Sequence, residues 1–322
     1  MDDGWPGRFA RLTRRALEQV SDLIPAGPPA WTDLPREPAG RVVEVTDFGA
    51  NPGRLRMHVR IPTAPGRRDA PLLVLLHGCG QDAVRFAAAS GFAALADRLG
   101  APLLLPDQQA ENNQQRCFNW FRPGDTRRGG GEAASIRQMV GEALRRFGAD
   151  PRHVYVAGLS AGGALAAALL ASYPDVFAAG GVVAGLPVGA ARDVHEAVRQ
   201  MQRPEPAPRE AWVARVERLT GARWPRLSVW HGEADRTVDP ANAEALVAQW
   251  TGLLGLPEAP DAEHRPAPHL RRRVWGDAVE HWSLAGYGHA FPVAGGEADP
   301  FVLPAGIAAA EAMARFWGLA AD

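Results

Sequence analysis

The sequence predicts an α/β protein with a mostly parallel central sheet covered by helices on both faces. Short, continuously apolar runs recur along the chain, and such runs are typical of strands that are buried on both sides. Helix-length segments separate these runs, and this alternation favours parallel strands. With 322 residues, of which 46% are hydrophobic and 22% charged, the chain is long and apolar enough to bury a sizeable core.

The N-terminal part is expected to differ from this core. Residues 5–20 are compatible with a short amphipathic helix, and the proline-rich stretch that follows is typical of an extended arm, so residues 1–39 are interpreted as an N-terminal helix and arm. Residues 40–322 are expected to form one domain. Its first elements, at 42–48 and 55–61, alternate apolar and polar side chains and therefore predict a hairpin of half-buried strands.

The core elements follow in alternation. Buried strands are predicted at 71–76, 102–105, 153–157, 180–184, 227–230 and 279–284, and helices at 83–99, 132–147, 161–172, 241–254 and 307–319. The segment 187–224 breaks the pattern, because it is rich in Arg and Pro and contains only a helix-like stretch at 211–219. We interpret it as a cap-like insertion near the carboxyl edge of the sheet.

Composition excludes several kinds of function. The 35 basic and 36 acidic residues leave a net charge of −1, so no nucleic-acid or membrane partner is expected. The sequence contains no lysine, which excludes a Schiff-base lysine and a P-loop lysine. Two cysteines are too few for a disulfide scaffold or a four-thiolate zinc site. The N-terminus lacks the pattern of a signal peptide, so a cytoplasmic protein is expected, or a secreted one if the sequence has been trimmed.

A Gly-Leu-Ser-Ala-Gly motif at 158–162 points to nucleophilic chemistry. It lies between a predicted buried strand and an alanine-rich helix, where a sharp turn forces the serine outward and requires glycines beside it. The N–H groups at the start of the helix would lie next to any oxyanion formed there. We therefore interpret Ser160 as a nucleophile rather than as an incidental serine in a glycine-rich turn.

A serine nucleophile needs a base, and the base needs an acid to orient it. In this strand–turn–helix architecture the acid and then the histidine follow the serine along the chain. Asp235 lies just after a predicted strand and a glycine turn and is the predicted acid; Glu233 and Asp239 on the same loop remain alternatives. His289, on a glycine-rich loop after the last strand, is the predicted base.

The other histidines fit the role of base less well. His264 and His269 lie in or beside a proline-rich polar loop, and His281 lies within a strand-like segment where side chains are usually packed. His77 precedes the serine and is interpreted as structural, holding its loop.

The oxyanion hole needs two backbone N–H groups. One belongs to Ala161, directly after the nucleophile. The second is expected from the loop after the third strand, where Leu-His-Gly-Cys-Gly-Gln occupies 76–81 and Cys79 is the candidate donor through its backbone.

Five sequence blocks carry a more specific signal. They are the blocks at 76–81 and 158–162, Arg-Cys-Phe-Asn-Trp-Phe at 116–121, His-Gly-Glu-Ala-Asp at 231–235 and Gly-Tyr-Gly-His at 286–289. Together they resemble the poly(3-hydroxybutyrate) depolymerase family of esterases, over roughly residues 40–318. The resemblance implies an α/β-hydrolase fold related to feruloyl and acetylxylan esterases, short-chain polyester or oligoester substrates, and no cofactor.

We therefore expect a serine carboxylester hydrolase that needs no metal and cleaves short-chain hydroxyalkanoate esters or oligomers through an acyl-enzyme. A feruloyl- or acetylxylan-type esterase, a peptidase and a non-catalytic ligand-binding module remain alternatives; the complete set of Ser160, Asp235 and His289 weighs against the last. Soluble oligomers are expected to be preferred over crystalline polymer, because no binding module is recognised after His289. The oligomeric state is left open.

Four aromatic residues near these motifs are candidates to line the acyl site, namely Trp120, Phe121, Trp282 and Phe291, although each could equally be a core residue. Cys79 and Cys117 are expected to form a disulfide, because their loops follow strands that are neighbours in this fold and so emerge at the same edge of the sheet. Two free thiols are the alternative in a cytoplasmic protein.

Overall fold

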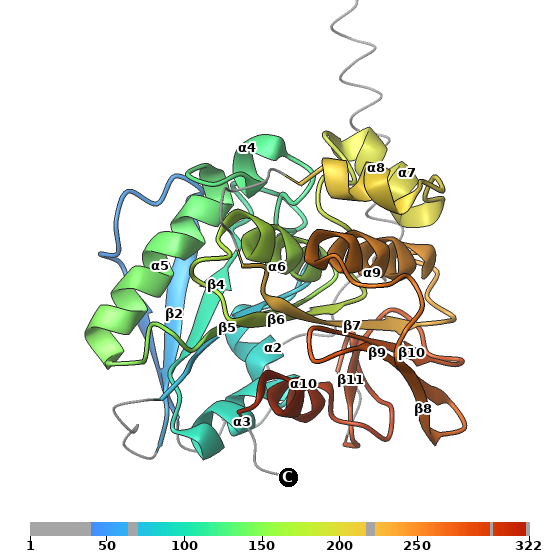
Figure 1. Ribbon diagram of the computed structural model, residues 1–322. Helices are drawn as coiled ribbons and strands as arrows, with labels where there is room; N and C mark the ends of the chain where they lie inside the picture. Colours follow the sequence, from blue (N-terminus) through green and yellow to red (C-terminus); the bar gives the residue numbers. More distant parts are fainter. Residues whose placement is uncertain (1–39, 64–69, 217–222, 297–298, 320–322) are drawn as a thin grey trace, which may run out of the picture.

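The computed structural model describes residues 40–63, 70–216, 223–296 and 299–319, and a ten-stranded sheet runs through them (Figure 1). The order of its strands is β1-β2-β4-β3-β5-β6-β7-β10-β9-β8. Their bounds are β1 (Arg41–Val45), β2 (Arg56–Ile61), β3 (Leu72–Leu76), β4 (Leu103–Asp107), β5 (Val154–Leu159), β6 (Ala179–Val183), β7 (Arg226–Gly232), β8 (Ala262–Ala267), β9 (Leu270–Trp275) and β10 (Val279–Leu284).

The central strands β4, β3, β5, β6, β7 and β10 are parallel, so their carboxyl ends meet at one edge of the sheet. The two ends of the sheet are antiparallel: β1 and β2 form a hairpin on β4, and β9 and β8 form a second hairpin on β10. Every residue of β3, β4, β5 and β6 is buried, as expected of strands covered on both faces.

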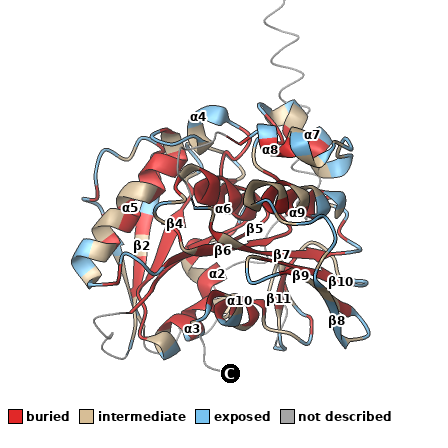
Figure 2. Ribbon diagram, viewed as in Figure 1, coloured by how far each residue is buried: buried red, intermediate tan, exposed pale blue. Residues whose placement is uncertain are grey.

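Helices cover both faces of this sheet (Figure 1). One layer consists of α5 (Gly131–Phe147), α6 (Ala161–Ser172) and α9 (Ala241–Leu254), and the other of α2 (Ala83–Ala89), α3 (Phe92–Leu99) and α10 (Ala309–Trp317). Figure 2 shows that the buried residues concentrate in the strands and on the helix sides that face them. Among the helices of the described ranges, none has the length and apolarity that a bilayer span requires.

Three further helices and a small sheet complete the described structure. The helix α4 (Pro123–Thr126) follows β4, and α7 (Val194–Gln202) and α8 (Arg209–Ala214) form the segment that was interpreted as an insertion. The strands β11 (Phe291–Val293) and β12 (Val302–Pro304) pair in parallel. The helix and arm expected within residues 1–39 lie outside the described residues.

The predicted order of strands and helices is confirmed, with three differences, and four further elements, α4, α7, β11 and β12, were not predicted. The helix predicted at 83–99 is two helices, because Gly91 adopts a left-handed conformation (φ 83°) between them. The helix-like stretch at 211–219 is the shorter α8, and residues 217–222 lie outside the described residues. The polar loop expected around His264 and His269 is in fact the β8–β9 hairpin.

Charge pairing explains why that hairpin escaped prediction. The strand β9 carries three consecutive arginines, so it shows no apolar pattern. Arg272 forms an ion pair with Glu280 of β10 (2.6 Å), and Arg273 pairs with Glu244 of α9 (2.5 Å). Because these carboxylates lie on other elements, the local pattern of β9 alone resembles a solvated loop.

Candidate active site

Ser160 lies at the sharp turn between β5 and α6, at the carboxyl edge of the sheet. Its backbone has φ 56° and ψ −118°, a conformation that L-residues rarely adopt and that a nucleophile on a strand-to-helix turn requires. The residue is 8% exposed. Within the described residues, the Ser160 hydroxyl has no hydrogen-bond partner, so it is available to a substrate.

The glycines of the motif allow the helix to pack closely behind this turn. A Cβ atom on Gly162 would lie 2.3 Å from the carbonyl oxygen of Leu76, at the end of β3. A Cβ atom on Gly158 would lie 2.3 Å from the carbonyl oxygen of Gly162 itself. Any side chain at either position would therefore push α6 away from the strands that precede Ser160 and the 76–81 loop.

His289 and Asp235 form a close pair beyond the ends of β10 and β7. The Nδ1 of His289 lies 2.7 Å from Oδ2 of Asp235, and the other carboxylate oxygen accepts hydrogen bonds from the N–H groups of Thr237 (2.8 Å) and Val238 (2.9 Å). The carboxylate is thus held on both sides. Among the described residues, the Nε2 of His289 has no hydrogen-bond partner.

The alternative residues occupy other positions. Asp239 caps the backbone of Ala241 (2.9 Å), and Glu233 is exposed. His269 lies 3.0 Å from the carbonyl oxygen of Ala305, and His281 is buried on β10 beside Arg273. In the part of the chain that the structure describes, none of them forms a hydrogen bond with the Asp235–His289 pair.

The Asp235 carboxyl is ionised beside His289. Burial raises the pKa of the Asp235 carboxyl, but hydrogen bonds from His231 and His289 outweigh burial and hold this pKa well below its usual range. Asp235 therefore stays ionised at neutral pH and stabilises the positive charge that His289 would gain as a base.

His231 is a residue that the sequence patterns did not assign. It lies on β7 and is buried, with Nε2 2.9 Å from the carbonyl oxygen of Val238 and 3.3 Å from Oδ2 of Asp235. Because both neighbours are acceptors, Nε2 carries a proton, and His231 holds the turn that contains Asp235. Its place four residues before Asp235, on the same strand and turn, was the only signal of this role in the sequence.

The two expected oxyanion donors come from the 76–81 loop and the start of α6. Cys79 is joined to Cys117 by a disulfide, with Cα atoms 4.2 Å apart, and Gly80 donates a hydrogen bond to the carbonyl oxygen of Gln115 (2.7 Å). These bonds tie the loop to the segment after β4. Among the described residues, the N–H groups of Cys79 and Ala161 have no protein acceptor, so both can donate to a ligand.

His77 controls the direction of the Cys79 N–H. Its Nδ1 lies 2.7 Å from the carbonyl oxygen of Gly78, and its Nε2 accepts a hydrogen bond from the N–H of Gln108 (3.1 Å). Burial lowers the pKa of His77, in keeping with a neutral ring that donates through Nδ1. Because the Gly78–Cys79 peptide is planar and trans, holding its carbonyl on one side directs its N–H to the other.

A buried carboxylate supports the segment that contains Cys117. Glu132, at the start of α5, accepts hydrogen bonds from the backbone N–H of Asn119 (2.8 Å), from its side-chain amide (2.7 Å) and from the side chain of Gln108 (2.6 Å). The ring of Phe118 in the same segment contacts His77, with ring centroids 4.9 Å apart. The Cys-Phe-Asn-Trp-Phe block therefore has a structural role beneath the 76–81 loop. Burial raises the pKa of Glu132 to about 7.

We expect Glu132 to make the stability of the protein depend on pH. Its pKa is higher in the folded than in the unfolded protein, so its contribution to the unfolding free energy is full below about pH 4.5 and is lost as the pH rises through 7. Between pH 5 and pH 8, the unfolding free energy of the wild type should fall by about 2 kcal/mol relative to that of the Glu132→Gln variant. Urea unfolding of both proteins at the two pH values measures this. If wild type and variant differed in unfolding free energy by the same amount at pH 5 and at pH 8, the prediction would be contradicted.

The four aromatic candidates divide into two pairs. Trp120 and Phe121 pack edge to face (5.7 Å) in a cluster that includes Ala161 and borders Cys79. Trp282 and Phe291 belong instead to the core beneath α2, α3 and α10, so the expectation that they line the acyl site is wrong. Trp282 stacks on Trp230 (4.7 Å), and Phe291 is 0% exposed and packs against Phe86 (5.6 Å). Both side chains contribute to the hydrophobic core.

Similarities to known proteins agree with this geometry. Residues 56–274 match the protein family described as esterase PHB depolymerase. The chain is 36% identical over 296 residues to poly(3-hydroxyalkanoate) depolymerase C of Paucimonas lemoignei. This match covers 86% of this chain and 70% of that protein. It is 32% identical over 276 residues to feruloyl esterase B of Talaromyces funiculosus, and this match covers 82% of this chain and 76% of that protein.

A solved structure has the same fold. The acetyl xylan esterase from Aspergillus awamori superposes with a TM-score of 0.77 at 24% sequence identity, and the match covers 87% of this chain and 100% of that one.

Proposed function

The chain belongs to the esterase PHB depolymerase family, and from this premise we propose that it hydrolyses short-chain hydroxyalkanoate esters and oligoesters with Ser160 as nucleophile. It is an esterase of the α/β-hydrolase fold. The observation that carries the proposed site is the 2.7 Å distance between Nδ1 of His289 and Oδ2 of Asp235. Along the chain, both residues come after the strained turn at Ser160, in the order serine, acid, histidine that this fold requires.

In the proposed reaction, His289 Nε2 removes the proton from Ser160 while the serine oxygen attacks the ester carbonyl. The N–H groups of Cys79 and Ala161 donate to the resulting oxyanion. His289 then returns the proton to the leaving alcohol, and an acyl-enzyme remains. Water, deprotonated by His289, hydrolyses this ester in the second half of the reaction. Throughout, Asp235 keeps the proton of His289 on Nδ1, so that Nε2 is the atom that acts as base.

The substrate class rests on the likeness to the depolymerase, at 36% identity. An ester of ferulic or acetic acid is the second candidate, because the chain is also 32% identical to feruloyl esterase B and 33% identical to an acetylxylan esterase of Coprinopsis cinerea. A panel of hydroxybutyrate oligomers, a feruloyl sugar ester and acetylated xylan distinguishes them. The proposal requires the highest kcat/KM for the oligomers, and a higher value for either plant-wall ester would overturn it.

We expect soluble oligomers to be hydrolysed faster than solid polymer. Degrading a solid requires the enzyme to stay adsorbed while the reaction repeats, and a linked binding module supplies that residence by raising the effective concentration. The helices of the 187–224 segment carry charged side chains, as in Val194–Gln202, which suit water better than an apolar solid. Trimeric hydroxybutyrate and denatured polymer granules should be compared at equal ester concentration. Faster release of product from the granules would contradict this expectation.

The disulfide between Cys79 and Cys117 indicates the redox environment in which the enzyme is stable. Disulfides persist in oxidising compartments and are rare in the cytoplasm. We therefore propose an oxidising compartment in place of the cytoplasmic location that the sequence suggested. Protein purified and denatured without a reducing agent should contain no titratable thiol, because Cys79 and Cys117 are paired. Two titratable thiols would contradict both the pairing and the proposed compartment.

A further inference from the structure

Phe301 is an aromatic residue that no sequence pattern assigned, and it contacts the proposed base. Its ring lies edge to face with the imidazole of His289, with ring centroids 6.1 Å apart and an angle of 77° between the planes. Within the described ranges, it is the only ring that contacts this imidazole. Both residues are partly exposed, so the contact lies near the surface of the molecule and not within its core.

The backbone of Phe301 has a conformation that bulky residues rarely adopt. Its φ is 62°, in the left-handed region that favours glycine. Phe301 is the third residue of a turn from Asp299 to Val302, whose ends exchange two backbone hydrogen bonds (2.9 and 3.0 Å). Pro300 is the second residue, and a turn with proline there and a positive φ at the next residue normally has glycine at that next position. Backbone strain of this kind is typical of functional positions.

The turn has a firm support on the neighbouring elements. The N–H of Phe291 donates a hydrogen bond to the carbonyl oxygen of Phe301 (2.7 Å), at the point where β11 pairs with β12. Arg85 of α2 forms an ion pair with Asp299 (3.6 Å). The turn is therefore held from two directions.

Gln81 connects the same turn to the loop of the expected oxyanion donor. Its side chain is buried; Oε1 accepts a hydrogen bond from the N–H of Gly78 (2.8 Å), and Nε2 donates one to the carbonyl oxygen of Pro300 (3.2 Å). Because an N–H only donates and a carbonyl only accepts, this orientation of the amide is the one that satisfies both partners. Gly78 directly precedes Cys79. The turn is therefore fixed relative to the 76–81 loop as well.

We propose that Phe301 is a positioning residue that holds the imidazole of His289 in the orientation that the reaction requires. This inference rests on the proposed function, in which Nε2 of His289 removes the proton from Ser160. Asp235 binds the imidazole at Nδ1, and a hydrogen bond at one atom leaves the ring able to tilt about that atom. The ring of Phe301 limits this tilt from a turn that is itself anchored. Glycine would relieve the backbone strain but would lose the contact.

Kinetics of variants at position 301 test the proposal, with p-nitrophenyl butyrate as the substrate. Phe301→Gly removes the ring and should stay folded, because glycine suits the left-handed backbone. Its kcat should fall about tenfold, the factor that one aromatic contact can supply. KM should change less than about twofold, since the contact is with the base and not with the substrate. Phe301→Tyr keeps the ring and should retain kcat to within about twofold.

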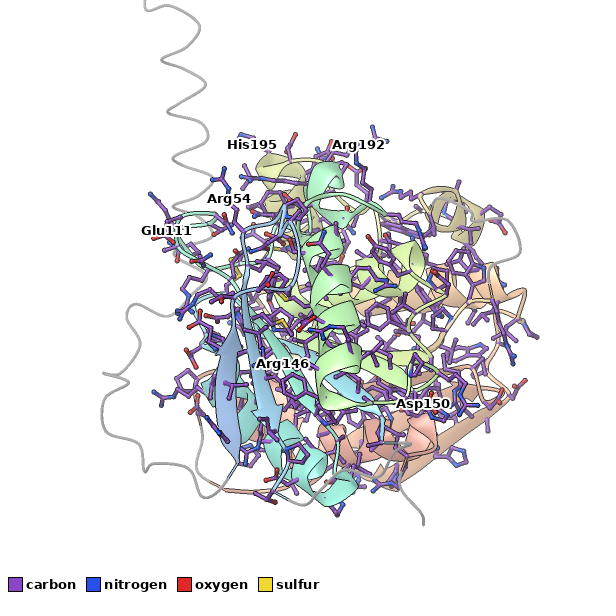
Figure 3. All side chains as sticks on the ribbon, turned by 90° about the vertical axis from the view of Figure 1, so that its left-hand side faces the viewer. Arg54, Glu111, Arg146, Asp150, Arg192 and His195 are labelled. Carbon is purple, nitrogen blue, oxygen red and sulfur yellow. A yellow bond between two sulfur atoms is a disulfide. The ribbon has the colours of Figure 1, made fainter. Side chains whose placement is uncertain are left out.

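Arg54→Gly is the matched control, because Arg54 also has a positive φ (50°) in a residue other than glycine. It precedes β2, and the strands β4, β3, β5, β6 and β7 lie between β2 and β10 in the sheet. Figure 3 shows Arg54 near Glu111, and the side chain of Asn112 donates to the carbonyl oxygen of Arg54 (3.1 Å). The control relieves the same kind of strain far from His289 and should keep wild-type kcat and KM.

Proton NMR of the His289 Nδ1–H, the proton shared with Asp235, gives a readout that does not depend on hydrolysis. The signal is identified by its absence from His289→Ala. It should broaden or disappear in Phe301→Gly, because an imidazole that tilts exchanges this proton with water more rapidly. It should persist in Phe301→Tyr and in Arg54→Gly.

Three results would overturn the inference. One is an unchanged kcat in Phe301→Gly. Another is a lower kcat with an intact Nδ1–H signal or with a raised KM, because Phe301 would then act on the substrate or only on the packing. The third is a loss of kcat that Phe301→Tyr does not restore. Hydrolysis of hydroxybutyrate oligomers by the wild type is measured separately. If they are not cleaved while the expected signal and rate changes occur, the proposed function fails and the inference stands; if they are cleaved and Phe301→Gly behaves as wild type, only the inference fails.

Discussion

Replacing Ser160 by alanine should lower kcat on a soluble ester by about a millionfold, because the variant lacks the atom that forms the acyl-enzyme. The fold should be retained, since within the described residues the hydroxyl has no hydrogen-bond partner to lose. His289→Ala should cost about as much, and the double variant little more, because the members of a triad act as a unit. Steady-state kinetics of the single and double variants measure this.

The matched control is Ser90→Ala at the end of α2, whose hydroxyl lies away from the proposed site and which should keep wild-type kcat. If the losses in Ser160→Ala and His289→Ala instead multiplied in the double variant, the two residues would act independently, and the proposed mechanism would be wrong.

Asp235→Asn should lower kcat by about ten-thousandfold, with little change in the fold. The N–H groups of Thr237 and Val238 would keep the amide oxygen in the place of Oδ1. The NH₂ group would then replace Oδ2 and face Nδ1 of His289 as a second donor. His289 could avoid this conflict only by moving its proton to Nε2, and an Nε2 that already carries a proton cannot accept one from Ser160.

Two alternative acids serve as controls for this variant. Glu233→Gln and Asp239→Asn should each retain activity to within a few fold, because neither carboxylate contacts His289 in the described structure. A fully active Asp235→Asn protein together with an inactive Glu233→Gln or Asp239→Asn protein would assign the orienting role to the other loop residue.

The parts of the proposed site that follow from chain order and local geometry could be predicted from the sequence. The turn at Ser160 was predicted because strand, turn and helix each leave a local pattern around the motif, and the structure confirms that turn. Asp235 and His289 followed from their positions after later strands, and the pairing of Cys79 with Cys117 followed from neighbouring strands. In the structure His289 is hydrogen-bonded to Asp235 and Cys79 is bonded to Cys117, and the strands β3, β5, β7 and β10 are parallel, so their carboxyl ends lie at one edge of the sheet.

The features that were missed depend on side-chain packing, buried charge and peptide orientation, none of which a local sequence pattern encodes. Trp282 is near His289 in sequence, but its strand turns the indole towards Trp230 and the core. The support that Glu132 gives to Asn119 involves a buried charge, which no local pattern reveals. The orientation of Cys79 by His77 depends on one hydrogen bond to the Gly78 carbonyl, and a sequence pattern carries no information on peptide orientation.

The most direct test of the account is covalent labelling of the folded wild-type protein with a fluorophosphonate, followed by mass spectrometry of its peptides. Phosphonylation requires a serine activated by a neighbouring base and an oxyanion hole that accepts the phosphonyl oxygen. The account predicts one adduct, on Ser160, with a labelling rate that falls by orders of magnitude in His289→Ala and remains unchanged in Ser90→Ala. Absence of an adduct in folded protein, or an adduct on another residue, would contradict it.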